Sequence, residues 1–485
     1  MKRKERTVIT TDGEVDDQNS LIRALLYSND MDIAGIVMTS SMYHYAGNET
    51  IPPFRWTGTK WVYDLLDAYE KDYDNLVCHD PNYPAPGYLR SVTKIGNISN
   101  QGEMEEVTEG SAFLEQLFLD DDPRTLYVQT WGGTNTTARA LKSIEEKWKD
   151  TDKWDVIQSK INEKVVIYII LDQDASYQDY IAVHWPDIKI INDTSNFWHF
   201  AYAWQFHSDE LNSTLKGDWC FNNLVNNDSA LMSHYALMGD GKIIDGELYE
   251  EQRGTEDYLK ANPNYHRYDF ISEGDSPSFF YLIDVGLRSL EDPSFGGWGS
   301  RFGRINDRLY KNIVLDYDPY SKQFEAQYSL SRWFNAIQND FAARVKWTLS
   351  KEVKKELEAP VIEVEEGLDI SAKASDMVQL HAHVLNKEKD ECDYRWWRYF
   401  EADTYGELEL ETEVIKAGDL QLNIVGKTNE KVLDPIRIQN ADTPSMSFKI
   451  PGDAQKGDTI HMIIEVSTKD EIPITRYQRV IITIQ

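Results

Sequence analysis

The sequence predicts two domains: an α/β domain with a mainly parallel, open sheet over residues 1–350, and an all-β sandwich over residues 359–485. Three observations support this division. Short β-branched runs alternate with amphipathic helical patterns through the first part, as in a parallel sheet covered by helices. The charged stretch that begins at Lys351, KEVKKELEAPVIEVEEG, carries no core pattern and reads as a linker. After it, short runs alternate apolar and polar residues, which is typical of an antiparallel sandwich.

The elements of the first domain follow these patterns along the chain. Each expected strand is a short apolar run, and each expected helix has apolar residues at helical spacing. Strands are expected at Val8–Thr11, Asp32–Ser40, Thr125–Thr130 and Lys164–Leu171, and helices at Ser20–Tyr27, 59–73, 110–119 and 135–148. Residues 197–270 form an aromatic-rich region of loops and helices, and YDFISEGDSPSFFYLIDVGL (268–287) predicts a strand, an acidic turn and a helix.

The second domain is predicted from alternating runs that are separated by turn residues. These runs are MVQLHAHVL, DYRWWRYF, SFKIP, TIHMIIEVS and RYQRVIITIQ. Their spacing matches the short strands of an antiparallel sandwich of roughly 120 residues. The aromatic side chains of YRWWRYF either pack in the sandwich core, which we favour because a Trp on a central strand usually packs inside, or form an exposed platform for a glycan.

The charge balance limits the partners of the chain. Asp and Glu number 82 against 50 Lys and Arg, a formal net charge of −32. Such a surface repels phosphate backbones, so we expect no nucleic acid partner, and it disfavours anionic membranes. Neutral sugars and divalent cations remain compatible. Aromatic residues make up 12% of the chain, enough for sugar-stacking faces as well as a large core.

The number and spacing of cysteines and the length of the apolar runs exclude further classes of protein. The three cysteines, Cys78, Cys220 and Cys392, are too far apart for a disulfide framework or a zinc-finger site. No apolar run is long enough for a membrane-spanning helix, so no membrane insertion is expected. The first residues, MKRKERTVITTDG, lack the apolar segment of a secretory signal. Removal of a signal, as for a secreted or periplasmic protein, and a cytoplasmic location therefore both stay open.

Acidic or amide-rich turns follow four of the expected strands. They contain Asp12, Glu14, Asp16 and Asp17, then WGGTNTT (131–137), then Gln173 and Asp174, and finally Asp275. Open α/β sheets bind their ligands at the carboxyl ends of the strands, where these turns would converge. Calcium accepts about six to eight oxygen ligands in irregular geometry. The pattern therefore predicts a calcium site, against the alternative of a solvated acidic loop in which Asp17 caps a helix.

The motifs resemble those of known hydrolases. TDGEVDDQNSL is similar to the acidic fingerprint of the nucleoside hydrolases, and the closer match is a nucleoside hydrolase-like family of mostly secreted bacterial proteins described as cellulose-binding. Its further motifs correspond, in the same order, to WGGTNT (131–136), DQD (172–174), EGDSPSF (273–279) and GGWGSR (296–301). YRWW (394–397) and the final RYQRVIITI resemble its Ig-like C-terminal domain. The resemblance covers essentially the whole chain and implies a nucleoside hydrolase-like fold.

The resemblance also implies residue roles. Asp12 would bind calcium and act as the base on the attacking water, and Asp16 would hold sugar hydroxyls. The implied metal ligands are Asp12, Asp17, Asp275 and a backbone carbonyl, which a gapless alignment places at Asn135 and a direct Thr-Asn match places at Thr134.

The sequence departs from the nucleoside hydrolases where these recognise the base and protonate the leaving group. Thr10 replaces the first Asp of the fingerprint, and Gly13 and Glu14 replace its Pro-Gly. Gly274 replaces the His that is the leaving-group acid in some members, and the ribose motif is absent. Nucleosides are therefore not expected as substrates.

Other side chains must then serve as the acid and contact the sugar. Asp174, Glu14 or His44 could supply the acid, although a packed or surface histidine is the more common role for a residue such as His44. The expected catalytic residues are Asp12, Asp16 and Asp174, and the expected substrate contacts are Glu14, Asp16, His44, Trp131, Asn135 and Gln173.

Two functions follow from this site. The favoured one is a calcium-dependent glycoside hydrolase that cleaves an N- or O-linked, furanoside-like sugar by metal-assisted attack of water. The alternative is a non-catalytic carbohydrate-binding protein on a hydrolase fold. Retention of the whole acidic cluster favours the enzyme, and loss of the histidine at Gly274 favours the binder. The partner in either case is a carbohydrate, and homo-oligomer formation stays open.

Overall fold

A computed structural model describes residues 4–406, 411–417, 420–427 and 436–485. The first domain is built on an eight-stranded sheet in the order β3-β2-β1-β4-β5-β6-β8-β7. All neighbouring pairs are parallel except β7 with β8. The strands are β1 (Glu5–Thr11), β2 (Met31–Met38), β3 (Thr93–Ile95), β4 (Leu126–Thr130), β5 (Val165–Ile170), β6 (Lys189–Asp193), β7 (Gly303–Arg304) and β8 (Leu309–Lys311).

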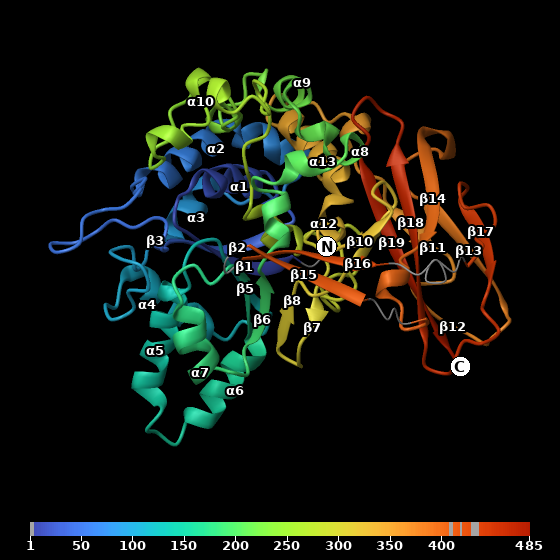
Figure 1. Ribbon diagram of the computed structural model, residues 1–485, viewed down its shortest axis with the longest axis horizontal. Helices are drawn as coiled ribbons and strands as arrows, with labels where there is room; N and C mark the ends of the chain where they lie inside the picture. Colours follow the sequence, from blue (N-terminus) through green and yellow to red (C-terminus); the bar gives the residue numbers. More distant parts are fainter. Residues whose placement is uncertain (1–3, 407–410, 418–419, 428–435) are drawn as a thin grey trace.

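Helices cover both faces of this sheet (Figure 1). The central strand β1 shows why: Val8 packs into one core with residues of α4 to α6, and the next residue, Ile9, packs into another with residues of α1, α2 and α13. These helices are α1 (Val15–Leu26), α2 (Lys60–His79), α4 (Glu109–Leu119), α5 (Asn135–Trp148), α6 (Trp154–Lys164) and α13 (Phe334–Trp347). Because both faces are buried, the strands read as continuous apolar runs. The predicted α/β architecture is confirmed.

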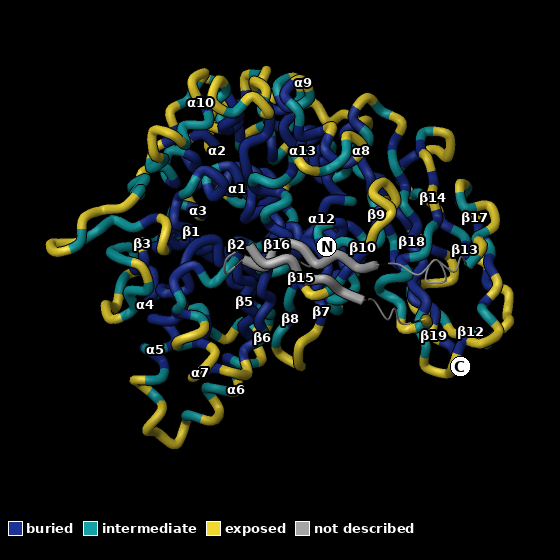
Figure 2. The backbone as a smooth tube through the Cα atoms, viewed as in Figure 1, coloured by how far each residue is buried: buried dark blue, intermediate teal, exposed yellow. Residues whose placement is uncertain are grey.

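The remaining elements of the first domain are short. They are α3 (Pro86–Ser91), α7 (Ala182–His184), α8 (Asp209–Asn212), α9 (Gly217–Cys220), α10 (Glu256–Ala261), α11 (Ser276–Phe280), α12 (Tyr328–Ser331), β9 (Asp316–Asp318) and β10 (Gln323–Glu325). The strand predicted before the acidic turn at Asp275 is wrong, because Phe270 makes only a single bridge, to Leu237. Figure 2 shows that buried residues line the sheet and inner helices, while the outer turns are exposed.

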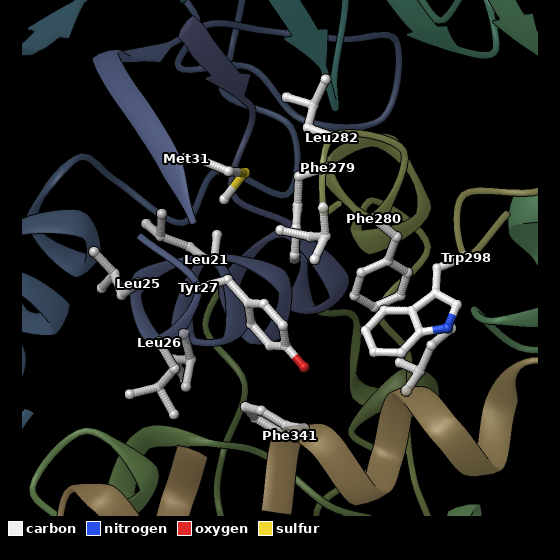
Figure 3. Packing of buried hydrophobic residues seen from close by; sticks show 14 of the residues in the cluster. Leu21, Leu25, Leu26, Tyr27, Met31, Phe279, Phe280, Leu282, Trp298 and Phe341 are labelled. Atoms are coloured by element: carbon white, nitrogen blue, oxygen red, sulfur yellow. The ribbon is translucent and has the colours of Figure 1, made fainter. Parts of the chain in front are cut away.

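The short helix α11 is anchored in the larger core. Figure 3 shows Phe279 and Phe280 of this helix in the same cluster as Leu21 of α1, Tyr27 directly after α1, and Phe341 of α13. All five side chains are fully buried. Since α11 begins one residue after Asp275, this packing sets the position of that carboxylate relative to α1.

The C-terminal region contains two packed sheets, as predicted. One has the order β11-β13-β17 and is antiparallel; in the other, β12-β19-β18-β14, β12 pairs with β19 in parallel. The strands are β11 (Ile362–Val364), β12 (Asp369–Ala372), β13 (Met377–Val384), β14 (Cys392–Arg398), β17 (Ser445–Lys449), β18 (Thr459–Thr468) and β19 (Thr475–Ile484). A hairpin of β15 (Glu411–Ala417) and β16 (Leu420–Lys427) instead extends the β9-β10 pair.

The aromatic run of β14 is buried. Trp396 lies in the core between the two sheets, and Trp397 packs against the core of the first domain. There Trp333 contacts both Trp397 and Tyr477, at ring-centroid distances of 6.1 and 5.2 Å. These contacts favour the core interpretation of YRWWRYF over an exposed platform. Among the described residues, no helix combines the length and the apolar character needed to cross a membrane.

Candidate functional site

The acidic fingerprint forms the tight connection between β1 and α1. Asp12 follows the last residue of β1, and Gly13 has a φ of 88°, a left-handed conformation that favours glycine. A side chain on Gly13 would also approach the indole nitrogen of Trp61 to 2.9 Å. This turn leaves Asp12 at the carboxyl edge of the sheet and places Asp16 and Asp17 in the first turn of α1. Carboxylates are favoured there by the positive end of the helix.

Three carboxylates from two distant segments converge at this edge. Oxygen atoms of Asp16, Asp17 and Asp275 all lie within 4.8 Å of one another. Asp12 lies beside them, because its backbone N–H donates to Oδ1 of Asp17 at 3.2 Å. The family resemblance implies Asp12, Asp17 and Asp275 as the carboxylate ligands of the metal, without Asp16. The structure therefore adds Asp16 to the candidate ligand set and leaves Asp12 next to it.

The cluster has buried oxygen atoms that nothing in the described chain satisfies. Both carboxylate oxygens of Asp12, Oδ1 of Asp16 and Oδ2 of Asp275 are buried without a hydrogen-bond partner among the described residues. None of the four aspartates forms a salt bridge with a described Lys, Arg or His. Buried carboxylates without partners are costly, so these atoms fit a cation ligand set.

Burial and mutual repulsion change the acidity of these groups. Burial, together with the nearby Glu14 carboxylate, raises the pKa of Asp12 to about 7. Burial also raises the pKa of Asp16, Asp17 and Asp275 well above the usual range, and the neighbouring carboxylates add to each shift. A divalent cation would reverse this effect by favouring the ionised forms. All-oxygen, carboxylate-rich donors are those that calcium prefers.

A cavity of about 430 Å³ opens onto the cluster. It combines acidic, basic and aromatic walls. Its lining includes Glu14, Asp16, Asp17, Tyr43, Arg55, Trp131, Leu171, Gln173, Phe197, Trp198, Tyr202, Glu251, Arg253 and Asp275. The two arginines pair with Glu247, whose Oε2 lies 2.6 Å from Arg55 and 3.5 Å from Arg253. The volume lies in the range of about 300–1,000 Å³ that is usual for small-molecule sites.

Glu14 faces the cavity, and His44 lies behind it. The hydroxyl of Tyr202 donates to Oε1 of Glu14 at 3.1 Å. His44 is fully buried; its Nδ1 lies 2.6 Å from the carbonyl oxygen of Arg55, and its Nε2 lies 3.6 Å from Oε2 of Glu14. His44 does not line the cavity, so its geometry is that of a residue acting through Glu14 and not of a direct substrate contact.

Asn135 and Asp174 have other partners. The side-chain nitrogen of Asn135 donates to Ser40, Asn97 and Glu103, and its oxygen accepts from Thr39. Asn135 begins α5, and helical geometry directs its carbonyl along the helix, away from the sheet edge. The structure thus gives the predicted ligand and substrate roles of Asn135 no support.

Asp174 holds the start of α5. Its Oδ2 accepts the backbone N–H of Asn135 at 2.9 Å, and its Oδ1 accepts the hydroxyl of Thr134 and the N–H of Ser176. It does not line the cavity. Its geometry is that of a structural carboxylate and gives no support to the predicted role as acid. The carbonyl of Thr134, the alternative predicted metal ligand, accepts the backbone N–H of Ala138 in the first turn of α5. Its predicted role as a ligand is therefore not supported either.

Trp131 and Gln173 form the floor of the cavity. The indole N–H of Trp131 donates to Ser278 at 2.9 Å, and the ring is almost wholly buried against Phe279. The amide nitrogen of Gln173 donates to the carbonyls of Trp131 and Ile170. Both predicted contacts therefore line the site, with their N–H groups committed to the protein.

Position 274 is crowded, so a larger side chain there would displace its neighbours. A Cβ on Gly274 would lie 2.8 Å from Oδ2 of Asp16, 3.1 Å from Ala201 and 3.3 Å from the ring of Phe197. The histidine found here in nucleoside hydrolases would require these neighbours to shift. The 197–202 segment that occupies this space also supplies Trp198 and Tyr202. Sequence reasoning missed these residues and the two arginines, because no motif marks them; the only signal was the aromatic density of residues 197–270.

Two sequence profiles match the chain. Residues 6–302 match the cellulose-binding Sde182, nucleoside hydrolase-like domain, and residues 377–484 match the C-terminal domain of the cellulose-binding protein Sde0182. The chain belongs to the Sde182 family. The resemblance inferred from the motifs is confirmed. A search of curated proteins found no match.

One solved structure agrees with the Sde182 assignment at the level of the fold. A nucleoside hydrolase-related protein from Saccharophagus degradans, described as associated with carbohydrate metabolism, aligns over 100% of both chains with 23% identity and a TM-score of 0.69. The effector protein XOO4466 covers 72% of this chain and 95% of its own at 9% identity, with a TM-score of only 0.36. The first of these shares the fold, including the nucleoside hydrolase-like sheet.

Proposed function

We propose that this Sde182-family protein is a calcium-dependent glycoside hydrolase that acts on a neutral, furanoside-like N- or O-glycoside. One observation carries the proposal: four buried carboxylate oxygens, on Asp12, Asp16 and Asp275, have no hydrogen-bond partner among the described residues, and Asp16 and Asp275 line the cavity at this sheet edge. The description of the matching family as cellulose-binding supports a carbohydrate ligand.

The donor set fits a calcium ion. Asp16, Asp17 and Asp275 would hold it, with Asp12 adjacent. When bound, the ion would lower the pKa of a water molecule and polarise sugar hydroxyls.

The aspartates then have separable roles. Asp12 accepts the proton of the attacking water, since its carboxylate has no competing hydrogen bond. Asp16 accepts hydrogen bonds from sugar hydroxyls through its unpartnered Oδ1. The surrounding negative charge stabilises the oxocarbenium-like transition state of glycoside cleavage. On the leaving-group side, Glu14 and the Tyr202 hydroxyl bonded to it face the cavity in place of the missing histidine.

A non-catalytic carbohydrate-binding protein is the second candidate. The crowding at position 274 favours it, because Phe197 and Ala201 lie close to where the side chain of the leaving-group acid would begin. In that case the same aspartates and a cation would bind sugar hydroxyls without cleavage.

The two candidates separate in one experiment. A panel of aryl furanosides and pyranosides is tested for release of the aryl group, with calcium or with a chelator, using wild type, Asp12→Asn and the control Asp121→Asn, whose side chain is fully exposed. The enzyme proposal expects turnover that needs calcium and is lost only in Asp12→Asn. Absence of turnover by any variant, with sugar binding retained, would establish the binder instead.

A further inference from the structure

A second cavity, of about 710 Å³, adjoins the acidic one. Trp198 and Tyr202 line both cavities, so the two cavities meet at these two rings. Their centroids are 5.9 Å apart, and the guanidinium of Arg253 lies 4.5 Å from the centroid of the Tyr202 ring. These packed aromatic rings thus mark the junction of the two cavities, and a ligand in one cavity borders directly on the other.

Beyond this junction, exposed aromatic side chains line the second cavity. Phe206, at the end of the short helix Trp204–Phe206, is 80% exposed, and Tyr320, in the turn between β9 and β10, is 49% exposed. Large rings left in water within a hollow surface mark a binding site for a ligand with apolar faces. Rings of this kind stack on the C–H faces of sugars.

The polar part of the second cavity is acidic or neutral. Asp318, Glu325 and Gln327 line it, and no Lys or Arg does among the described residues. The two histidines in the lining, His199 and His207, hydrogen-bond each other at 3.1 Å, and burial lowers the pKa of both, which favours their neutral forms. This acidic and neutral lining accepts hydrogen bonds from hydroxyl groups and repels anions, which excludes phosphorylated and acidic ligands.

We infer that the two cavities form one groove for a neutral oligosaccharide, with one sugar at the aspartate cluster and the following sugars on Trp198, Phe206 and Tyr320. The inference rests on the proposed carbohydrate ligand and adds that this ligand is a chain of several sugars. The continuity of the two cavities through Trp198 and Tyr202 carries it. The indole N–H of Trp198, which is buried without an acceptor among the described residues, is a further donor for a sugar oxygen at this junction.

The test compares chain length with groove variants. Binding of cello-, xylo- and arabino-oligosaccharides, from monosaccharide to hexasaccharide, is measured by titration calorimetry in calcium for wild type, Phe206→Ala and Tyr320→Ala. Tyr249→Ala is the matched control, since Tyr249 is 83% exposed and lines neither cavity. Thermal unfolding checks that each variant is folded.

For at least one series, affinity should rise with chain length in wild type and in Tyr249→Ala. Each groove variant should lose about two- to tenfold in affinity for the longer chains, the contribution of one stacked ring, and keep its affinity for the monosaccharide. The inference is overturned if no series shows a gain with length, or if the groove variants retain it. Failure of the aryl glycosides to react, with the length-dependent binding intact, would count against the enzyme proposal alone.

Discussion

In the absence of calcium, the free energy of unfolding of this protein should fall as the pH rises. The pKa shift of Asp12 gives the size of this effect. Folding raises the pKa of this buried carboxyl from 3.8 to about 7. The folded protein then holds the proton more tightly than the unfolded chain. The contribution of Asp12 to stability is therefore fully present below about pH 4 and is lost as the pH rises through about 7.

The magnitude follows from the shift. The full rise in pKa corresponds to about 4 kcal/mol, of which about 3 kcal/mol is lost between about pH 5 and about pH 8. Calcium at about 100 times its Kd would return about 2.7 kcal/mol by binding only the folded state. The expected free energy of unfolding in chelator is thus lower at the higher pH, and calcium restores much of it there.

Chemical denaturation in chelator, at both pH values, measures this directly. Asp12→Asn lacks the titrating group, so its free energy of unfolding should change less with pH than that of wild type, by about 3 kcal/mol. Asp121→Asn should behave as wild type. Parallel pH dependence of wild type and Asp12→Asn would refute the reasoning about Asp12. No increase in stability on adding calcium at the higher pH would refute the cation site.

Further outcomes can be checked separately. In calcium, Asp12→Asn should lose about a hundredfold to ten-thousandfold in the rate of glycoside cleavage, while calorimetry finds calcium binding largely kept, because Asp16, Asp17 and Asp275 remain to hold the metal. Gly274→His should lower the free energy of denaturant unfolding by about 1–3 kcal/mol through the clash with Asp16 and Phe197, and a normal stability would contradict that clash. Wild type should release base from inosine or uridine only slowly, as followed by chromatography; rapid release would show that the missing histidine is dispensable. Limited proteolysis with mass spectrometry should find the first cuts between Ser350 and Gly367, where most residues are exposed; no cut there would argue against an accessible linker.

The local parts of the fold were predictable because they depend on neighbouring residues. The apolar run of β1 and the helical spacing of α1 identify a strand and a helix, and the turn between them must then lie at the sheet edge. Asp12, Asp16 and Asp17 could be placed for that reason. Asp275 needed the family motif, because only tertiary packing of α11 brings it to α1.

Features that depend on long-range contacts were not predictable. Nothing near Asn135 in the sequence indicates that its amide would tie together three other segments, or that Asp174 would hold the start of α5. The crowding around position 274 depends on Phe197, which is distant in the chain. Likewise, the pairing of Arg55 with Glu247 joins two loops that carry no regular pattern.

The anchoring of α11 has a consequence for the lifetime of the folded state. Asp275 leads directly into α11, whose Phe279 lies in the core with Leu21 of α1, while Asp17 belongs to the first turn of α1. A cation held by both aspartates would tie together two chain segments that are far apart in sequence, in the manner of a cross-link that closes a long loop. These helices could then separate only after the ion had left. Calcium would therefore slow unfolding as well as shift its equilibrium, and the rate of ion release would limit how fast this core can open.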